Sequence, residues 1–190
     1  MDAIIYESEG HPIVFSNYQT SRPEAKTILF YGHYDVQPVD PISLWDSDPF
    51  DPVLSSIDNE PCIIARGASD EKGQLLTFLI ALKYIKNEVG ELPFCLKIIL
   101  EGEEECGSKT LPIFLEDYKD KLSADIAYVC DTGMWDKDTP AITRSLRGLL
   151  SEEFKIKGPD RDLHSGEFGG GAWNQIRIIS KILSDVYEDE

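Results

Sequence analysis

Acidic side chains are concentrated in one short stretch of the chain, directly after an apolar run. Residues 100–108 read LEGEEECGS and place four glutamates within five positions. A solvated acidic turn would explain such a run by itself. Carboxylates that converge in a folded protein repel one another, however, unless a cation offsets their charge. The stretch therefore indicates either a wet surface turn or a site that binds a cation.

Three other segments carry a histidine or a carboxylate: GHYD at 32–35, RGASDEKG at 66–73 and CD at 130–131. Taken singly, His33 is explained as a structural histidine, Asp70 as a helix N-cap and Asp131 as the start of a turn. One histidine with several carboxylates is a ligand set that suits zinc or manganese better than copper or an iron–sulfur cluster. Taken together, the segments favour the cation site.

Asp35 follows His33 by two residues. In an extended segment this spacing places both side chains on the same side of the backbone. A carboxylate beside a ligating histidine holds the imidazole in one tautomer. The pair is therefore typical of a metal ligand and the group that orients it.

Strands and helices alternate in the predicted fold. Apolar runs predict strands at residues 3–6, 13–18, 27–31, 94–100 and 126–130, and helical spacing or capping predicts helices at 74–89, from 108 or 110 to about 122, and at about 173–187. This order predicts an α/β fold with a mostly parallel sheet and helices on both faces. Ligands of such sheets bind beyond the carboxyl ends of the strands, where the acidic segments fall. Five prolines at 36–61 exclude a regular helix or a central strand there.

The pattern changes near Arg147. Residues 149–157 alternate like a strand with one wet face, and GEFGGG at 166–171 precedes the last helix. We therefore expect a catalytic metal-binding domain at 1–147 and the first part of a smaller α+β lid or dimerisation domain at 148–190.

Composition excludes several classes of protein. The 190 residues carry a formal net charge of −17, which argues against nucleic acid as a partner. The N-terminus lacks the pattern of a signal peptide, and no apolar block is long enough to cross a membrane, so we expect a cytoplasmic protein without a membrane partner. The four cysteines form no C-x-x-C pair and are expected to be reduced core thiols.

The ordered motifs GHYDVQP, RGASDEKG, EGEEECGS, CDT and DLHSGEFGG, within residues 28–173, resemble one family. It is the dinuclear-zinc amidohydrolase family of carnosinase, cytosolic nonspecific dipeptidase, aminoacylase, succinyl-diaminopimelate desuccinylase and carboxypeptidase G. WDSDPFDP at 45–52 and DLHSG at 162–166 are most similar to the carnosinase and nonspecific dipeptidase branch. The resemblance implies a zinc-exopeptidase-like fold.

The resemblance also implies the metal ligands. His33 and Asp131 would bind one metal ion, Asp70 would bridge it to a second ion, and Glu105 would bind that second ion. The peptide bond after Asp70 would be cis. Two divalent ions are implied; zinc is the favoured metal, and manganese or cobalt would fit the same ligands.

The catalytic roles follow from the same resemblance. Glu104 would be the general base of a metal-activated water, and Asp35 would orient His33. His164 would reach into the active site of the partner subunit of a homodimer and stabilise the reacting carbonyl oxygen. Glu101 and Glu103 lie outside the family pattern and are expected to be solvated or to support the ligands. The implied reaction is hydrolysis of amide bonds in dipeptides or related N-acyl amino acids.

The chain departs from the family at its C-terminal side. Family members continue past this point and supply a final histidine to the second metal. We therefore expect the chain to be a fragment of a larger enzyme with weak or absent activity by itself. The alternative is a non-catalytic truncated paralogue that binds one metal or a partner subunit. A phosphate or nucleotide site at GEFGGG is disfavoured, because G-K-[ST] and a preceding strand with G-x-G-x-x-G are both missing.

Overall fold

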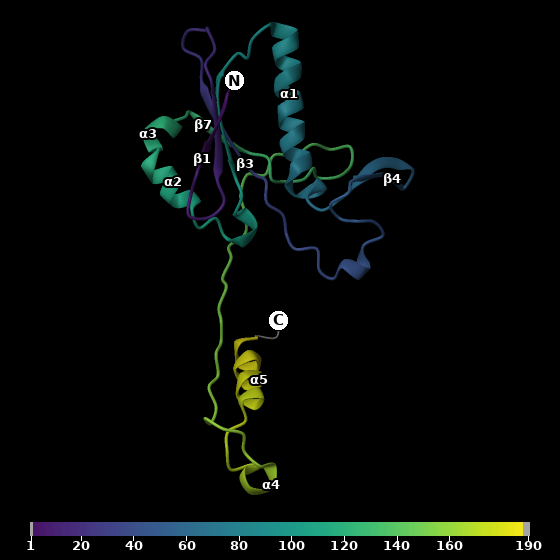
Figure 1. Cartoon of the computed structure of the whole chain (residues 1–190), viewed down its shortest axis with the longest axis vertical. Helices are drawn as coiled ribbons and strands as arrows, with labels where there is room; N and C mark the ends of the chain where they lie inside the picture. The colour runs from purple at the N-terminus through teal and green to yellow at the C-terminus, as the bar shows by residue number, and fades with distance from the viewer. Residues whose placement is uncertain (1, 188–190) are drawn as a thin grey trace. The chain divides into compact units, whose positions relative to one another are not determined.

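The structure is a computed structural model that describes residues 2–187 (Figure 1). The chain divides into two units, residues 1–142 and residues 143–190. The strands are β1 (Ala3–Tyr6), β2 (Ile13–Tyr18), β3 (Thr27–His33), β4 (Val53–Ile57), β5 (Glu60–Ile64), β6 (Cys95–Glu101) and β7 (Ile126–Val129). The helices are α1 (Gly73–Val89), α2 (Leu111–Asp117), α3 (Lys119–Leu122), α4 (Ser165–Phe168) and α5 (Gln175–Val186), with the short helical turns η1 (Ile42–Leu44), η2 (Ala68–Lys72) and η3 (Glu104–Cys106).

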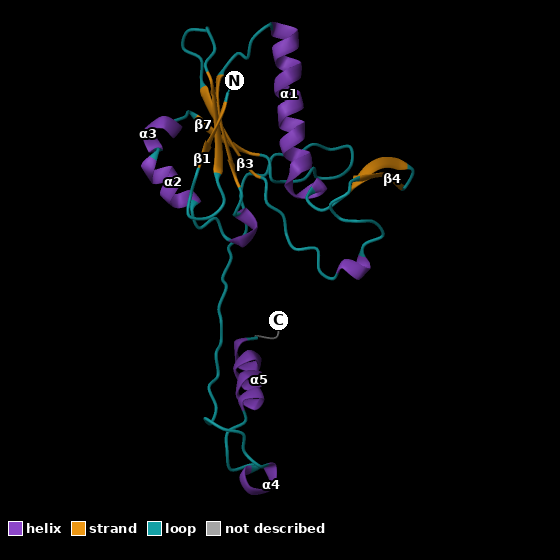
Figure 2. Cartoon of the chain, viewed as in Figure 1, coloured by secondary structure: helices purple, strands orange, loops and turns teal. Residues whose placement is uncertain are grey.

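A five-stranded sheet in the order β1-β2-β6-β3-β7 forms the centre of the first unit (Figure 2). Strands β6, β3 and β7 are parallel, whereas β1 and β2 form antiparallel pairs at one edge. The α/β class is confirmed, and the sheet is mixed because the short turn between β1 and β2 can join only antiparallel strands. The register pairs His33 with Glu101, so the last residues of β3 and β6 lie side by side. This end of the sheet is called the rim below.

Helix α1 covers one face of the sheet (Figure 1). Leu75, Phe78, Leu82 and Ile85 recur at helical spacing and pack against the buried core around Phe30. The rings of Phe30 and Phe78 stack with their centroids 3.8 Å apart. The helix ends at Val89, and the residue after it, Gly90, has a positive φ of 82° that suits glycine. This packing fixes the N-terminal end of α1, and with it η2, relative to β3.

Helices α2 and α3 cover the opposite face (Figure 1). Phe114 and Leu122 are buried there against Ile13, Phe15 and Ile99 of the sheet. The single helix predicted to reach about residue 122 is divided at Tyr118, whose φ of −115° and ψ of 16° are not helical. The prediction of helices on both faces is confirmed.

Strands β4 and β5 form a two-stranded hairpin that the sequence did not predict. Asp58 and Asn59 connect the strands with φ values of 52° and 66°. Two central residues with positive φ define the tight turn that best matches the twist of a hairpin, and Asp and Asn tolerate that conformation. The hairpin is separate from the main sheet, so the exclusion of a central strand from residues 36–61 holds.

The second unit contains α4 and α5. The strand predicted at residues 149–157 is wrong: this described segment forms neither helix nor strand, and Leu149 and Leu150 are exposed. Alternation by itself does not make a strand, because the backbone groups need a neighbouring strand to pair with. The roles predicted for 1–147 and 148–190 stay predictions.

The cysteines and the helices bear on two further expectations. All four cysteines are free; Cys95 is buried, whereas Cys106 is exposed, so the expectation of core thiols is wrong for Cys106. Among residues 2–187, no helix combines the length and apolar character that a membrane span needs.

Candidate metal centre

Side chains from four segments converge at the rim. His33 ends β3, Asp131 follows β7, Asp70 lies in η2 before α1, and Glu104 and Glu105 lie in η3 after β6. Ligand atoms within 4.8 Å of one another form two sets, His33–Asp70–Glu105 and His33–Glu104–Asp131. The structure thus brings together all four predicted metal ligands and the predicted base.

His33 is fully buried and lies in both sets. Its Nε2 atom is 3.1 Å from Asp70 Oδ1 and 3.6 Å from Asp131 Oδ2. On the other side of the ring, Nδ1 is 3.3 Å from Asp35 Oδ1 and 3.2 Å from the backbone oxygen of Asp35. One nitrogen therefore faces the carboxylate cluster, and the other faces the residue predicted to orient the ring.

Asp35 also contacts the turn that carries Glu104 and Glu105. Its Oδ1 accepts a hydrogen bond from the N–H of Glu104 at 3.3 Å, and its Oδ2 accepts one from the N–H of Glu105 at 3.1 Å. The first N–H groups of a helical turn lack partners within the turn, and a carboxylate satisfies them well. Asp35 therefore links the position of His33 to that of η3.

Gln37 is a residue at the rim that the sequence analysis missed. Its Nε2 donates to Glu105 Oε2 at 2.8 Å. Gln37 lies in the motif GHYDVQP, which gave a signal that the position matters but not what it contacts. The bond restricts the side chain of Glu105 at the rim.

Glu71 is a second missed residue, fully buried beneath the cluster. Its Oε1 accepts a hydrogen bond from the backbone N–H of His33, and its Oε2 has no partner among the described residues. A Cβ atom on Gly32 would lie only 2.7 Å from Glu71 Oε1, so glycine leaves the room for this approach. The Asp70–Glu71 peptide is cis, as the family resemblance implied.

Of the two alternatives expected for Glu101 and Glu103, the solvated one is wrong, and support of the ligands stays a prediction. Glu101 is 1% exposed and Glu103 is 8% exposed. The carboxylate of Glu103 accepts hydrogen bonds from the hydroxyl and, at 3.3 Å, the N–H of Thr110, directly before α2. Two of the four glutamates thus point into the protein, and the other two belong to the cluster.

Without a cation, burial and repulsion between the charges disfavour the ionised form of the carboxylates in this cluster. Burial, followed by the charges of Glu105, Asp131 and Asp70, raises the pKa of Glu104. Burial and then the charge of Asp70 raise the pKa of Asp131. Burial by itself would lower the pKa of His33, but the surrounding carboxylates raise it overall. A divalent cation would replace these protons and offset the repulsion.

The metal-free chain is therefore expected to lose stability as the pH rises from about 4 to 7. Folding raises the pKa values of Glu104 and Asp131, and that of Glu71 mainly through burial, above ordinary carboxyl values of about 4. The folded state then binds more protons than the unfolded chain in this window, so the free energy of unfolding falls with rising pH. The raised pKa of His33 acts in the same direction. Urea denaturation with a chelator at several pH values measures the slope.

The control for this prediction is Glu104→Gln, which removes one of the titrating groups and should make the slope shallower. Excess zinc should restore stability at pH 7, because metal binding displaces the protons. A metal-free chain whose stability rises over this pH range would contradict the prediction.

His164 lies in the second unit and is exposed. Its Nδ1 accepts a hydrogen bond from the N–H of Gly166 at 3.1 Å and caps the start of α4. Its predicted role at a partner's active site stays a prediction.

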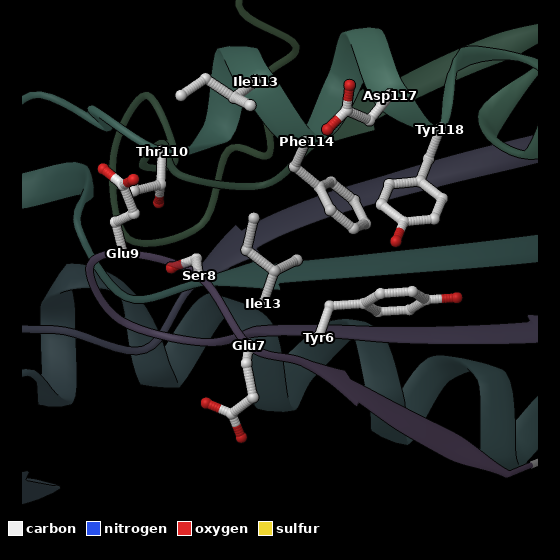
Figure 3. Close-up of a pocket in the computed structure, with 10 residues that line it drawn as sticks. All are labelled: Tyr6, Glu7, Ser8, Glu9, Ile13, Thr110, Ile113, Phe114, Asp117 and Tyr118. Atoms are coloured by element: carbon white, nitrogen blue, oxygen red, sulfur yellow. The ribbon is translucent and has the colours of Figure 1, made fainter.

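A separate pocket of about 440 Å³ lies between the β1–β2 turn and α2 (Figure 3). It is lined by Tyr6, Glu7, Ser8, Glu9, Ile13, Thr110, Ile113, Phe114, Asp117 and Tyr118. None of these residues belongs to the candidate ligand sets. The pocket is therefore distinct from the candidate metal centre.

Residues 29–179 match the model of a known family, Peptidase family M20/M25/M40. The Cys-Gly metallodipeptidase dug1 of Schizosaccharomyces pombe is 35% identical over 175 residues, which cover 91% of this chain and 36% of that protein. The Beta-Ala-His dipeptidase of Homo sapiens is 38% identical over 152 residues, which cover 79% of this chain and 29% of that protein. The chain therefore belongs to the M20/M25/M40 peptidase family.

Solved structures of related proteins agree with this family assignment. The M20 family metallo-carboxypeptidase Sso-CP2 from Sulfolobus solfataricus superposes with a TM-score of 0.62 at 42% identity, over 70% of this chain and 29% of that one. Human carnosine dipeptidase 1 superposes with a TM-score of 0.62 at 30% identity, over 94% of this chain and 37% of that one. The family resemblance read from the sequence is confirmed. The chain spans about a third of the length of the relatives it matches.

Proposed function

We propose that this protein hydrolyses amide bonds of dipeptides or related N-acyl amino acids with the help of two divalent metal ions. The observation that carries the proposal is the pair of overlapping ligand sets at the rim, with His33 in both. Imidazole and carboxylate donors suit zinc, and manganese and cobalt fit the same set. The names of the relatives, Cys-Gly metallodipeptidase and Beta-Ala-His dipeptidase, support dipeptides as the substrate class.

Each residue at the rim has a role in this proposal. Asp70 would bridge the two ions, His33 and Asp131 would hold one of them, and Glu105 would hold the other. Asp35, 3.3 Å from His33 Nδ1, keeps the imidazole in the tautomer whose Nε2 is free to bind a metal. Bound divalent ions would polarise the substrate carbonyl and lower the pKa of a water molecule towards ~7.

Glu104 is proposed as the general base. Its carboxylate lies in the same set as His33 and Asp131, so it can reach a water molecule held at the rim. It would take a proton from that water and deliver it to the departing amine.

The proposal extends to the second unit. His164 would contact the reacting carbonyl of a partner subunit in a homodimer, and residues 148–190 would belong to the lid or dimerisation domain. These assignments, like a cytoplasmic location, rest on the sequence analysis.

A second candidate function is a protein that binds a single metal ion without turnover. His33 Nε2 lies 3.1 Å from Asp70 Oδ1 and 3.6 Å from Asp131 Oδ2, and each ligand set contains one of these carboxylates, so the same nitrogen is within reach of both sets. A shared nitrogen permits the two sets to close around one ion. This observation favours the non-catalytic alternative.

Metal content and hydrolysis separate the two functions. The 190-residue chain is loaded with zinc, dialysed and analysed by elemental mass spectrometry, then assayed with Cys-Gly and β-Ala-His. We expect about two ions per chain and slow hydrolysis that a chelator abolishes. One ion without hydrolysis would favour the non-catalytic binder, and no bound metal would overturn both candidates.

A further inference from the structure

Glu101 occupies a buried position that an apolar side chain of similar size could also fill. It ends β6 with 1% exposure, and its Oε2 has no hydrogen-bond partner among residues 2–187. No ion pair within the described residues offsets its charge. Burying a carboxylate carries a desolvation cost that an apolar side chain of similar size avoids. Its hydrogen bonds must therefore account for its presence.

Those hydrogen bonds join two parts of the rim. Glu101 Oε1 accepts from the hydroxyl of Tyr31 in β3 and, at 2.8 Å, from the hydroxyl of Ser108. The hydroxyl of Tyr31 is the donor in its bond, because a carboxylate oxygen only accepts. Glu101 thus connects the sheet to the residue that ends the turn after η3.

Ser108 closes the turn that carries Glu104 and Glu105. Its φ of 47° lies in the left-handed region, which is unfavourable for serine without compensation. Its N–H donates to the backbone oxygen of Glu103 at 2.7 Å, and its hydroxyl donates to Glu101. The turn is therefore held at its end by Glu101 and at its beginning by Asp35.

We infer that Glu101 is a positioning residue: through Ser108 and Tyr31, its buried carboxylate fixes the turn that presents Glu104 and Glu105 at the rim. The consequence for metal binding rests on the proposed function, whereas the effect on the turn does not. Glu101 is absent from both candidate ligand sets, so it acts on the site through the turn. Glu103 differs, because its carboxylate bonds to Thr110 and secures the start of α2.

Hydrogen exchange of the metal-free chain tests the effect on the turn. Ser108→Ala removes the hydroxyl that joins the turn to Glu101, and amides 104–108 should then exchange about tenfold faster than in the wild type. The amides of β6 should keep their rates. Tyr31→Phe, which removes the other donor, should have a smaller effect in the same direction. Unchanged exchange at 104–108 in both variants would overturn the inference.

The matched control is Ser16→Ala in β2. The hydroxyl of Ser16 also donates one bond, to the backbone oxygen of Asp2 at 2.9 Å, but it lies away from the rim. This variant should leave amides 104–108 unchanged. An equal acceleration in Ser16→Ala would show a general loosening of the sheet and would also overturn the inference.

Zinc affinity, measured by competition with a coloured chelator, tests the consequence for the metal. Ser108→Ala should weaken binding several-fold, and the loss should be non-additive with Glu105→Gln, because both act on the same ligand. Glu101→Gln keeps an acceptor oxygen for both hydroxyls but loses the charge that strengthens the two bonds, so it should weaken binding less than Ser108→Ala does. Fully additive losses would overturn the inference. A wild-type chain that binds no zinc would refute the proposed function only, since the exchange experiment still decides the role of Glu101.

Discussion

Replacing Glu104 by glutamine is expected to lower kcat for dipeptide hydrolysis by about 10²–10⁴-fold while the metal content stays unchanged. The amide keeps the size of the side chain but cannot accept a proton from water. The four predicted metal ligands remain in place. Turnover by stopped assay and metal content by elemental analysis, on the same preparation, separate the loss of a base from the loss of a ligand.

Two further variants serve as controls. Glu105→Gln should weaken metal binding and lower turnover together, because Glu105 is proposed as a ligand. Glu116→Gln, at an exposed position on α2, should change neither. If Glu104→Gln retains wild-type turnover, another group is the base; if it loses metal as Glu105→Gln does, Glu104 is a ligand.

The parts of the fold that the sequence predicts are those in which local pattern and tertiary burial agree. The run at 94–100 is apolar except for Lys97, and β6 (Cys95–Glu101) is covered on one face by α1 and on the other by α2 and α3. Leu75, Phe78 and Leu82 recur at helical spacing, and α1 packs this partly buried stripe against the core. Where the same side chains fit the local pattern and also fill the core, the periodicity of the sequence predicts the correct type of element.

The prediction failed where structure depends on a partner in space. Residues 149–157 alternate, yet they form no strand in the described chain, because alternation does not supply a neighbour. The β4–β5 hairpin was missed although Asp58 and Asn59 gave a turn signal. The prolines of that region exclude a central strand, and they do not exclude a separate hairpin.

The acidic stretch at residues 100–108 shows that prediction from the sequence has the same limit at the candidate metal centre. Its composition predicts a cation or a wet turn, but it does not say which glutamate points where. In the structure the strand ends at Glu101, which points inward, and η3 then turns Glu104 and Glu105 into the ligand sets. The burial of Glu101 and Glu71 could not be predicted, because their partners are distant in the sequence. Glu101 accepts from the hydroxyl of Tyr31, and Glu71 accepts from the backbone N–H of His33 in β3.

His33→Ala is expected to weaken zinc binding by on the order of 100-fold or more, since even the loss of a supporting contact to a ligand costs 10–100-fold. Both ligand sets found among the described residues contain His33, so its loss affects both at once. No other histidine lies in either set, and the remaining ligands are carboxylates, which repel one another more strongly without the imidazole between them. Affinity is measured by competition with a chelator near neutral pH.

The matched control for that variant is His11→Ala, which removes an exposed histidine in the β1–β2 turn and should leave zinc affinity unchanged. Because His33 is fully buried, urea denaturation of the metal-free His33→Ala chain must show a cooperative transition before its affinity is interpreted. A folded His33→Ala chain that binds zinc as tightly as the wild type would place the metal on carboxylates alone. The imidazole of His33 would then have a structural role at the rim and no role in metal binding.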